Sequence, residues 1–269
     1  AFNQLSYCRQ CIESLLQYMR PPYQLILVDN GSTDGVGEYF DSIPGATVIH
    51  AEKNLGFPAG ANLGLRCARG HVVMLNSDVL VTEGWLERLK RALLSADDIG
   101  MAGPVSNYAL GDQYIDGLTL RNQEEIHAFA RKRAVEKAGQ AHDVYALTGF
   151  CLLIRDAALA KVGLFDESFG IGNFEDTDYC YRMRAAGYRM VVAEDCFVFH
   201  YGGRTFEGMG LTGGRFRELM AENRQRYIEK WGLRLPESAP DEHRSLHLNA
   251  RANEAFAENR PKEAVELLR

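Results

Sequence analysis

Three carboxylates lie close together in the segment FEDTDYCYRM, namely Glu175, Asp176 and Asp178. A carboxylate held near a hydroxyl group can remove its proton as a general base. Carboxylates in the first turn of a helix are also stabilised by the helix dipole, by ~0.3–1 kcal/mol each, without any catalytic role. The segment therefore predicts either a catalytic base or a helix start that is rich in negative charge.

Helical geometry separates these three side chains. At ~100° per residue, Asp176 lies on the same side of a helix as Cys180, which is the apolar side. Asp178 is turned ~200° away and lies four residues before Arg182, at the spacing of an ordinary ion pair. Glu175 shares the general side of Asp178. We therefore expect Asp176 to point toward a pocket and the other two to act as helix-start charges.

Polar residues also follow two short apolar runs, LILV and VVML; they are Asp29 and Asn30 after the first run, and Asn76, Ser77 and Asp78 after the second. In α/β sheets, ligands collect at the carboxyl ends of the strands. Asp29 could accept hydrogen bonds from a pyrimidine base or a ribose, and Asp78 could offer an oxygen ligand to a hard divalent cation beside a diphosphate. Turn formation explains both segments as well, with Asp34 as the cap of the next helix.

Glycines and a late histidine add to this pattern. The segment NLGFPAGANLGL repeats glycine every four residues at Gly56, Gly60 and Gly64, so that backbone can approach a ligand closely. His200, in FHYGG, could ligate a metal ion as a neutral imidazole, neutralise phosphate as an imidazolium, or simply end a strand. Arg204 follows in a glycine-rich stretch, where it could add charge to a leaving diphosphate or lie in solvent.

The first half of the chain alternates apolar strand-like runs with segments of helical periodicity. This alternation predicts an α/β fold with a Rossmann-like, mostly parallel nucleotide-binding sheet and helices on both faces. Such a sheet normally begins with a strand, whereas the sequence enters at AFNQLSYCRQ, which predicts a loop leading into a helix. We therefore expect an initial strand to be missing from this numbering.

Composition excludes several classes of function. The 269 residues are 46% hydrophobic, and 30 basic residues stand against 36 acidic ones, giving a net charge of −6. No broad basic surface is expected, so nucleic acid is not a predicted partner. The longest apolar runs fall short of the ~20 residues of a transmembrane helix, and no signal peptide is visible, which predicts a cytoplasmic protein. A peripheral position at the inner membrane is compatible with this.

The sequence has six cysteines, of which Cys8 and Cys11 form a CxxC motif. We interpret this pair as two residues that pack on one helix, in preference to a zinc or redox site.

Six segments together are similar to family 2 glycosyltransferases, in order and in approximate spacing: LILVDNGSTDG, NLGFPAGANLGL, VVMLNSDVLVTEGWL, TGFCLLIRDAALAKVGLFDESFG, FEDTDYCYRMRAAGY and FVFHYGG. The resemblance covers about residues 1 to 206. It is greatest to bacterial members that build cell-surface polysaccharides or glycosylate proteins. It implies a GT-A fold, a nucleotide-diphosphate sugar donor, a Mg²⁺ or Mn²⁺ ion and inversion at the anomeric carbon.

The resemblance also implies roles for individual residues. Asp29 would contact the nucleotide base, Asp78 and His200 would hold the metal ion, and Asp176 would be the general base. Asn76 departs from the family pattern, since many relatives have aspartate there. The donor-binding residues that we expect are Asn3, Asp29, Asn30, Ser32, Asp34, Asn54, Gly60, Asn62, Asn76, Ser77 and Arg204. On the acceptor side we expect Gly149, Glu175 and Trp85, although Trp85 is also a good candidate for the core.

We expect residues 1–210 to form the GT-A domain, residues 211–235 a C-terminal helix packed on it, and residues 241–269 a further helical unit. The last segment resembles the opening of a tetratricopeptide repeat, and it would offer a surface to a protein partner. A C-terminal helical hairpin packed on the GT-A domain is the alternative.

The predicted function is transfer of a sugar to a hydroxyl group of a glycan, a lipid-linked glycan or a protein. A non-catalytic sugar- or nucleotide-binding module on a degenerate GT-A fold remains open, because the NSD segment has a single clear carboxylate. A sugar nucleotidyltransferase shares a similar sheet, but it would require a glycine-rich phosphate loop with a basic residue near the first strand, and AFNQLSYCRQ shows none.

Overall fold

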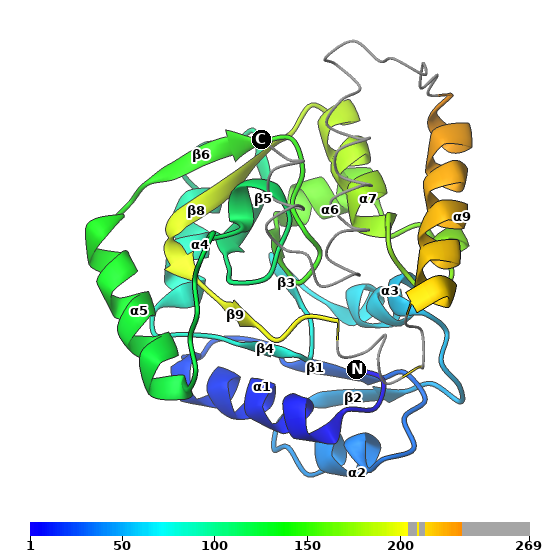
Figure 1. Cartoon of the computed structure of the whole chain (residues 1–269), viewed down its shortest axis with the longest axis horizontal. Coiled ribbons are helices and arrows are strands. Elements are labelled where there is room, and N and C mark those ends of the chain that lie inside the picture. The colour runs from blue at the N-terminus through cyan, green and yellow to red at the C-terminus, as the bar shows by residue number, and fades with distance from the viewer. Residues whose placement is uncertain (204–208, 210–212, 233–269) are drawn as a thin grey trace.

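The computed structural model describes residues 1–203, 209 and 213–232. The helices are α1 (Leu5–Tyr18), α2 (Val36–Asp41), α3 (Phe57–Cys67), α4 (Trp85–Leu93), α5 (Gln123–Glu136), α6 (Asp156–Val162), α7 (Glu175–Ala185) and α9 (Gly213–Trp231), with short 3-10 turns η1 (Gly111–Gln113) and η2 (Glu167–Phe169). The strands are β1 (Ile26–Asp29), β2 (Thr47–His50), β3 (Val72–Leu75), β4 (Val79–Leu80), β5 (Ile99–Val105), β6 (Ala141–Val144), β7 (Cys151–Ile154), β8 (Arg189–Phe197) and β9 (Phe199–His200). Figure 1 shows how the helices surround these strands.

The strands form one five-stranded sheet in the order β3-β7-β5-β8-β6 and two smaller pairs, β1-β2 and β4-β9. Parallel pairing, which the alternating sequence predicts, is present in β1-β2 and β5-β8. The pairs β3-β7, β5-β7, β6-β8 and β4-β9 are antiparallel. The sheet is therefore mixed, because β7 lies between β3 and β5 and runs opposite to both.

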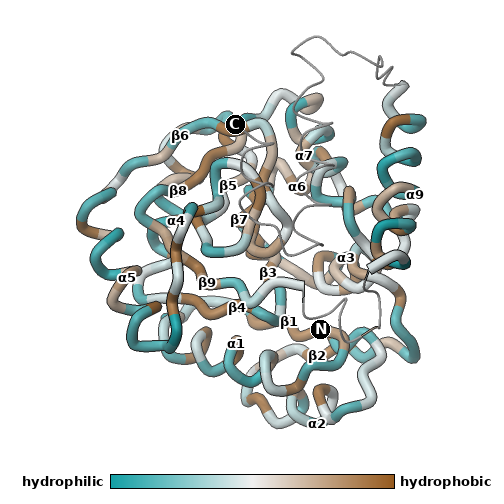
Figure 2. Tube along the Cα trace, viewed as in Figure 1, coloured by the Kyte–Doolittle hydropathy of each residue, from teal (hydrophilic) through white to brown (hydrophobic). Residues whose placement is uncertain are grey.

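Helices cover both faces of the central sheet. Along β7, Leu153 belongs to one hydrophobic cluster, whereas Leu152 and Ile154 belong to another, as expected for side chains that alternate across a strand. The first cluster includes residues of α1, α2 and α4, and the second includes residues of α3, α5, α6 and α7. Hydrophobic residues accordingly dominate β7 and β8 in Figure 2. Cys8 and Cys11 are buried in the first cluster, as the packing interpretation of the CxxC predicts.

The start of the chain is extended beside β1. The amino group of Ala1 donates a hydrogen bond to the carbonyl of Val28 (2.6 Å), and the N–H of Asn30 donates one to the carbonyl of Ala1 (2.8 Å). These two bonds are the pattern of a parallel strand pair opposite Asp29. The strand that we expect before this numbering stays a prediction.

At the other end of the described chain, α9 packs against the turn before α7. Phe169, Phe174, Met220 and Tyr227 form a small hydrophobic cluster there. The helix lies within the range 211–235 in which a C-terminal helix is expected. The predicted tetratricopeptide-like segment, residues 241–269, lies outside the described residues. No helix in the described part of the chain is both long enough and apolar enough to span a bilayer.

Candidate active site

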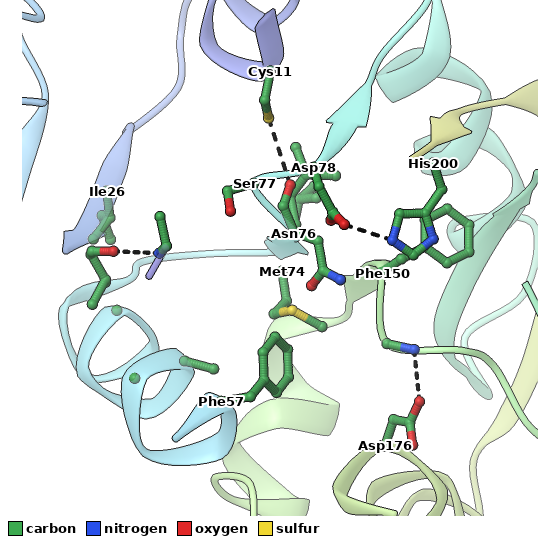
Figure 3. Close-up of a pocket in the computed structure, with 18 of the residues that line it drawn as sticks. Cys11, Ile26, Phe57, Met74, Asn76, Ser77, Asp78, Phe150, Asp176 and His200 are labelled. Carbon is green, nitrogen blue, oxygen red and sulfur yellow. Dashed lines mark hydrogen bonds and ion pairs between the residues drawn. The ribbon is translucent and has the colours of Figure 1, made fainter. Parts of the chain in front are cut away.

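A cavity of about 1140 Å³ opens where β1, β3, α1, α3 and the first residues of α7 meet. One part of it is polar, and Figure 3 shows Asn76, Ser77, Asp78, Asp176 and His200 around this part. The other part lies between β1 and β3 and is lined mainly by apolar residues of the two strands, together with Cys11 and Leu15 of α1. A charged diphosphate suits only the polar part, because an apolar wall cannot replace its hydration.

Strand pairing brings Asp78 and His200 together although they are far apart in the sequence. The turn Asn76–Asp78 connects β3 to β4, and the antiparallel register of β4 with β9 places His200 opposite Val79. The N–H of Tyr201 also donates to the carbonyl of Asp78 (3.0 Å). Both side chains are almost fully buried, and Nε2 of His200 lies 3.3 Å from Oδ1 of Asp78.

The second ring nitrogen of His200 decides what this pair can bind. Nδ1 lies 2.9 Å from the carbonyl oxygen of Tyr108, which can only accept, so Nδ1 carries a proton. In the neutral ring, Nε2 is then an acceptor that faces a carboxylate oxygen. Either a second proton or a cation must lie between the two atoms, and a divalent cation fits because imidazole nitrogen and carboxylate oxygen both ligate such ions. Phe150 stacks on the imidazole, with ring centroids 5.0 Å apart, and fixes its orientation.

Asp176 faces the same cavity from the start of α7. Its Oδ2 accepts a hydrogen bond from the N–H of Gly149 (2.9 Å), and its Oδ1 accepts one from the N–H of Thr177 (2.7 Å). Burial raises the pKa of Asp176, although these two N–H groups favour the charged form. A Cβ added to Gly149 would lie 3.2 Å from Cβ of Asp176, so glycine permits this close contact. The carboxylate is thus fixed, half-buried and more basic than an exposed aspartate.

Glu175 is buried beside Asp176, and its Oε2 has no hydrogen-bond partner. Burial and, secondarily, the negative charge of Asp176 raise the pKa of Glu175 well above its usual value. In its protonated form, which burial favours, Glu175 can donate a hydrogen bond from its O–H. Glu175 does lie in the first turn of α7, as expected, but it is buried there, which helical periodicity did not predict.

Asp178 does form the expected ion pair, with Nε of Arg182 2.8 Å from its Oδ2. The pair is buried rather than exposed, since Asp178 has no exposed surface. Its Oδ1 accepts a hydrogen bond from Nε1 of Trp231 (2.9 Å) and forms an ion pair with Nζ of Lys230 (2.6 Å), both on α9. The residue of α9 that contacts Asp178, Trp231, lies 53 residues later in the sequence. Helical periodicity within α7 therefore could not predict that Asp178 is buried.

The turn that leads into α7 is conformationally unusual. Asn173 and Phe174, neither of them glycine, have φ angles of 73° and 71°. A left-handed conformation costs roughly 1–2 kcal/mol for an L-residue, and it persists where surrounding contacts enforce it. Asn173 also lines the cavity, and its side-chain nitrogen is buried without a hydrogen-bond partner. The sequence analysis did not name Asn173. The two glycines in the segment FGIGNFED, which leads into α7, could have indicated an unusual turn at this position.

Asp29 ends β1 with both carboxylate oxygens engaged. Oδ1 accepts from the N–H of Ser32 (2.9 Å), and Oδ2 lies 3.2 Å from Nδ1 of His50. Burial opposes ionisation, but hydrogen bonds from Ser32 and His50 hold the pKa of Asp29 below its usual value. His50, which sequence reasoning missed, also contacts Asp41 (3.0 Å), and Asp41 and Asp29 together raise the pKa of His50. Asp29 is therefore an ionised acceptor in a prepared position.

Other predicted donor-binding residues form hydrogen bonds between the loops around Asp29. The side chain of Asn30 donates to the carbonyl of Gly56 (3.0 Å) and to Oδ1 of Asn54 (3.2 Å), and both asparagines line the cavity. The side chain of Asn3 accepts from the N–H of Thr33 (2.8 Å). Asp34 accepts from the N–H of Leu5 (3.0 Å), so it serves the start of α1 rather than the helix that follows it.

Gly60 lines the cavity on α3, where a Cβ would lie 2.9 Å from Nδ2 of Asn30. Asn62, two residues further along and also expected to bind the donor, is not among the residues that line the cavity. Its side chain is 1% exposed and donates to the carbonyl of Phe165 (2.9 Å) and to Glu167 (2.8 Å), which joins α3 to η2. Two residues along a helix change its face, and the spacing of the glycines did not reveal which face meets the ligand.

Trp85 and Arg204 complete the predicted set. Trp85 is 1% exposed in the hydrophobic core, so the structure favours its alternative interpretation as a core residue over a sugar-stacking platform. Arg204 lies outside the described residues. Asn76 and Ser77 line the polar part of the cavity, where the side-chain oxygen of Asn76 is buried without a partner.

Comparison with solved structures identifies the architecture. The chain is similar to a mannosyltransferase of Pyrobaculum calidifontis solved in complex with GDP-Man and Mn²⁺, with a TM-score of 0.60 and 17% identity. The match covers 99% of this chain and 71% of that protein. This likeness confirms the predicted GT-A fold.

Sequence comparison identifies the family. The chain is 27% identical over 247 residues to an uncharacterized protein of Sinorhizobium fredii, which covers 84% of this chain and 26% of that protein. It is 30% identical over 116 residues to the glycosyltransferase GlyG of Streptococcus pneumoniae, covering 41% of this chain and 38% of that protein. The chain thus spans well under half of the length of either relative. The model of the family described as "Glycosyl transferase family 2" matches residues 1–163, more than half of the sequence. The chain therefore belongs to glycosyl transferase family 2.

Proposed function

We propose that this chain transfers a sugar from a nucleotide-diphosphate sugar to an acceptor hydroxyl, with inversion at the anomeric carbon. The observation that carries the proposal is the position of Asp176, an anchored carboxylate that faces the same cavity as the Asp78–His200 pair. Inversion requires attack from the face opposite the departing diphosphate, and so it requires a base and a diphosphate site in one cavity. The relative GlyG is named as a glycosyltransferase and the structural neighbour as a mannosyltransferase, which agrees with this chemistry.

In this mechanism Asp176 accepts the proton of the acceptor hydroxyl. The N–H groups of Gly149 and Thr177 hold its two oxygens, so the carboxylate need not reorganise as the proton moves. The raised pKa of Asp176 strengthens it as a base. Glu175 lies next to it, and burial raises its pKa; in its protonated form it donates a hydrogen bond to a hydroxyl of the acceptor or of the transferred sugar.

The donor lies, in our proposal, between Asp29 and the Asn76–Asp78 turn. Asp29, ionised and oriented by Ser32 and His50, accepts from the nucleotide base. Asp78 and His200 would hold a Mg²⁺ or Mn²⁺ ion, which supplies positive charge to the leaving diphosphate when it is bound. The mannosyltransferase that shares the fold was solved with Mn²⁺, which supports a divalent ion here.

The acceptor is a glycan, a lipid-linked glycan or a protein, as in the bacterial surface-polysaccharide and protein-glycosylating enzymes that the sequence resembles. A non-catalytic nucleotide-sugar-binding module is the second candidate, because Asn76 stands where many relatives have a carboxylate. The two candidates share the donor site and differ in whether the Asp176 carboxylate is used.

Turnover separates the two candidates. We expect the protein with Mn²⁺ to release nucleoside diphosphate from at least one member of a panel of labelled UDP- and GDP-sugars. Asp176→Asn is expected to lower the rate by at least ~100-fold, because an amide cannot take up the proton, while the affinity for the nucleoside diphosphate stays within about twofold. Asp97→Asn, at an exposed aspartate before β5, is the control. Donor binding without turnover of any panel member would favour the binding module, and turnover retained by Asp176→Asn would refute the base assignment.

A further inference from the structure

The turn that leads into α7, and so to Asp176, is hydrogen-bonded to α9. The side chain of Asn223 on this helix is 1% exposed. Its Nδ2 donates hydrogen bonds to three main-chain carbonyls of the segment before α7, those of Phe169 (2.9 Å), Gly172 (2.8 Å) and Asn173 (3.1 Å). One amide group thus donates to three carbonyls of the loop that ends in the left-handed pair Asn173–Phe174.

The orientation of this amide is fixed. Oδ1 of Asn223 accepts a hydrogen bond from Nη1 of Arg226 (2.7 Å), one turn later on α9, so the nitrogen must face the carbonyls. An amide nitrogen has two hydrogens, and with three carbonyls around it at least one hydrogen is shared. In the described part of the chain, no other side-chain nitrogen donates to these three carbonyls, although that of Phe169 also accepts from the N–H of Gly172 (3.3 Å). Loss of the amide would leave three carbonyls without this donor next to a strained turn.

The same helix holds α7 at a second place. Trp231 donates to Oδ1 of the buried Asp178, Lys230 forms an ion pair with the same oxygen, and Lys230 also donates to Asp166 (2.6 Å). Between the two places, the ring of Tyr227 lies 6.0 Å from that of Phe174, centroid to centroid. These contacts hold α9 against α7. Among them, Asn223 is the residue that forms hydrogen bonds to the main chain of the turn before α7.

We propose that Asn223 is a positioning residue for Asp176. By holding the carbonyls of residues 169, 172 and 173, it keeps Asn173 and Phe174 left-handed and so sets the direction in which α7 begins. That direction places Oδ2 of Asp176 at the N–H of Gly149. The inference rests on the proposed function for its catalytic consequence, whereas the placement of Asp176 can be measured without turnover.

The test compares Asn223→Ala with Gln225→Ala, a matched control on the same helix whose exposed amide donates to Glu229 (2.8 Å). The first readout is hydrogen exchange of the Gly149 amide in ¹⁵N-labelled protein. We expect Asn223→Ala to speed this exchange by about tenfold or more, while the Val192 amide in β8 is unchanged, because the opening is local. Gln225→Ala should leave both amides as in the wild type. Unchanged protection of Gly149 in Asn223→Ala would overturn the proposal.

The second readout is kinetic, with the nucleotide sugar from the panel that the wild type hydrolyses fastest. We expect kcat of Asn223→Ala to fall by about 10- to 100-fold, since a displacement of ~1 Å at the base is enough for such a loss. The donor KM and the affinity for the nucleoside diphosphate with Mn²⁺ should stay within about twofold. Equal loss in kcat and in nucleotide affinity would indicate a general structural role and would overturn the proposal.

Two further outcomes are separable. If the wild type turns over no donor, the proposed function fails, and the exchange of the Gly149 amide still decides whether Asn223 positions Asp176. If Asn223→Ala does not fold, Asn223→Ser, which keeps one short donor, takes its place, and the same two results are required of it.

Discussion

Glu175 and Asp176 are neighbours in sequence whose carboxyl groups have different surroundings. Glu175 is enclosed, with one carboxylate oxygen unpartnered, whereas Asp176 is half-buried and accepts two N–H bonds. Two adjacent carboxyls in a poorly solvated site do not both ionise readily, and the proton favours the residue with less support for its charge. Burial raises the pKa of both residues, and only Asp176 has two N–H groups that favour its charged form.

This difference leads to a prediction for Glu175. Because a protonated carboxyl and a carboxamide have the same shape and both donate a hydrogen bond, Glu175→Gln should lose less than about tenfold in kcat. Glu175→Leu, which cannot donate, should lose about 100-fold. The measurement is kcat with the best panel donor at pH 7. A Gln variant as slow as the Leu variant would show that Glu175 acts as a carboxylate.

At the level of elements, the site depends on loops that approach each other closely. Gly56, at the start of α3, has φ 87° and ψ 166°, and a Cβ there would lie 1.9 Å from the carbonyl oxygen of Gly170. The N–H of Phe57 donates to the carbonyl of Ile171 (3.0 Å) across the same contact. The loop after η2 therefore rests directly on the glycine that precedes α3.

We expect Gly56→Ala to lower the free energy of unfolding by more than about 3 kcal/mol, because strain at a glycine-only conformation adds to a main-chain clash. Gly70→Ala is the control, since Gly70 also has positive φ (73°) but open space around its Cβ position, and it should cost only about 1–2 kcal/mol. Urea unfolding followed by circular dichroism measures both. If both variants lost the same free energy of unfolding, the loop at Gly170 would be able to move away from the added methyl group without a large penalty.

Local patterns in the sequence picked out Asp78 and Asp176, which line the cavity, and Asp29, whose neighbours Val28 and Asn30 line it. Asp29 and Asp78 both follow short apolar runs, and Asp176 was separated from its neighbours by helical periodicity. The strand order was not accessible, because nothing local in CLLI requires β7 to pair with both β3 and β5. The burial of Asp178, the structural role of Asn62 and the contact of His50 with Asp29 likewise depend on partners distant in the chain.

On the scale of the whole molecule, the proposed metal site joins two distant parts of the chain. Asp78 precedes β4 and His200 ends β9, and their contact depends on the pairing of these strands. A ligand that binds the folded state alone stabilises it by mass action. Millimolar Mn²⁺ with UDP or GDP should therefore raise the melting temperature of the wild type by several degrees.

His200→Ala should lose most of this ion-dependent shift. His142→Ala is the control, because His142 is partly exposed, lies on β6 and contacts Glu194 rather than Asp78. Differential scanning fluorimetry with and without the ion measures the shift. A full shift in His200→Ala would place the ion elsewhere and remove His200 from the proposed metal site.

The cysteines determine where this protein can be labelled. Cys67, at the end of α3, is exposed, whereas the other five thiols are buried. Burial also raises the pKa of Cys11 and of Cys180 to about 12, which lowers the thiolate fraction that reacts with electrophiles. A maleimide fluorophore should therefore couple to the folded protein at Cys67, without an engineered cysteine.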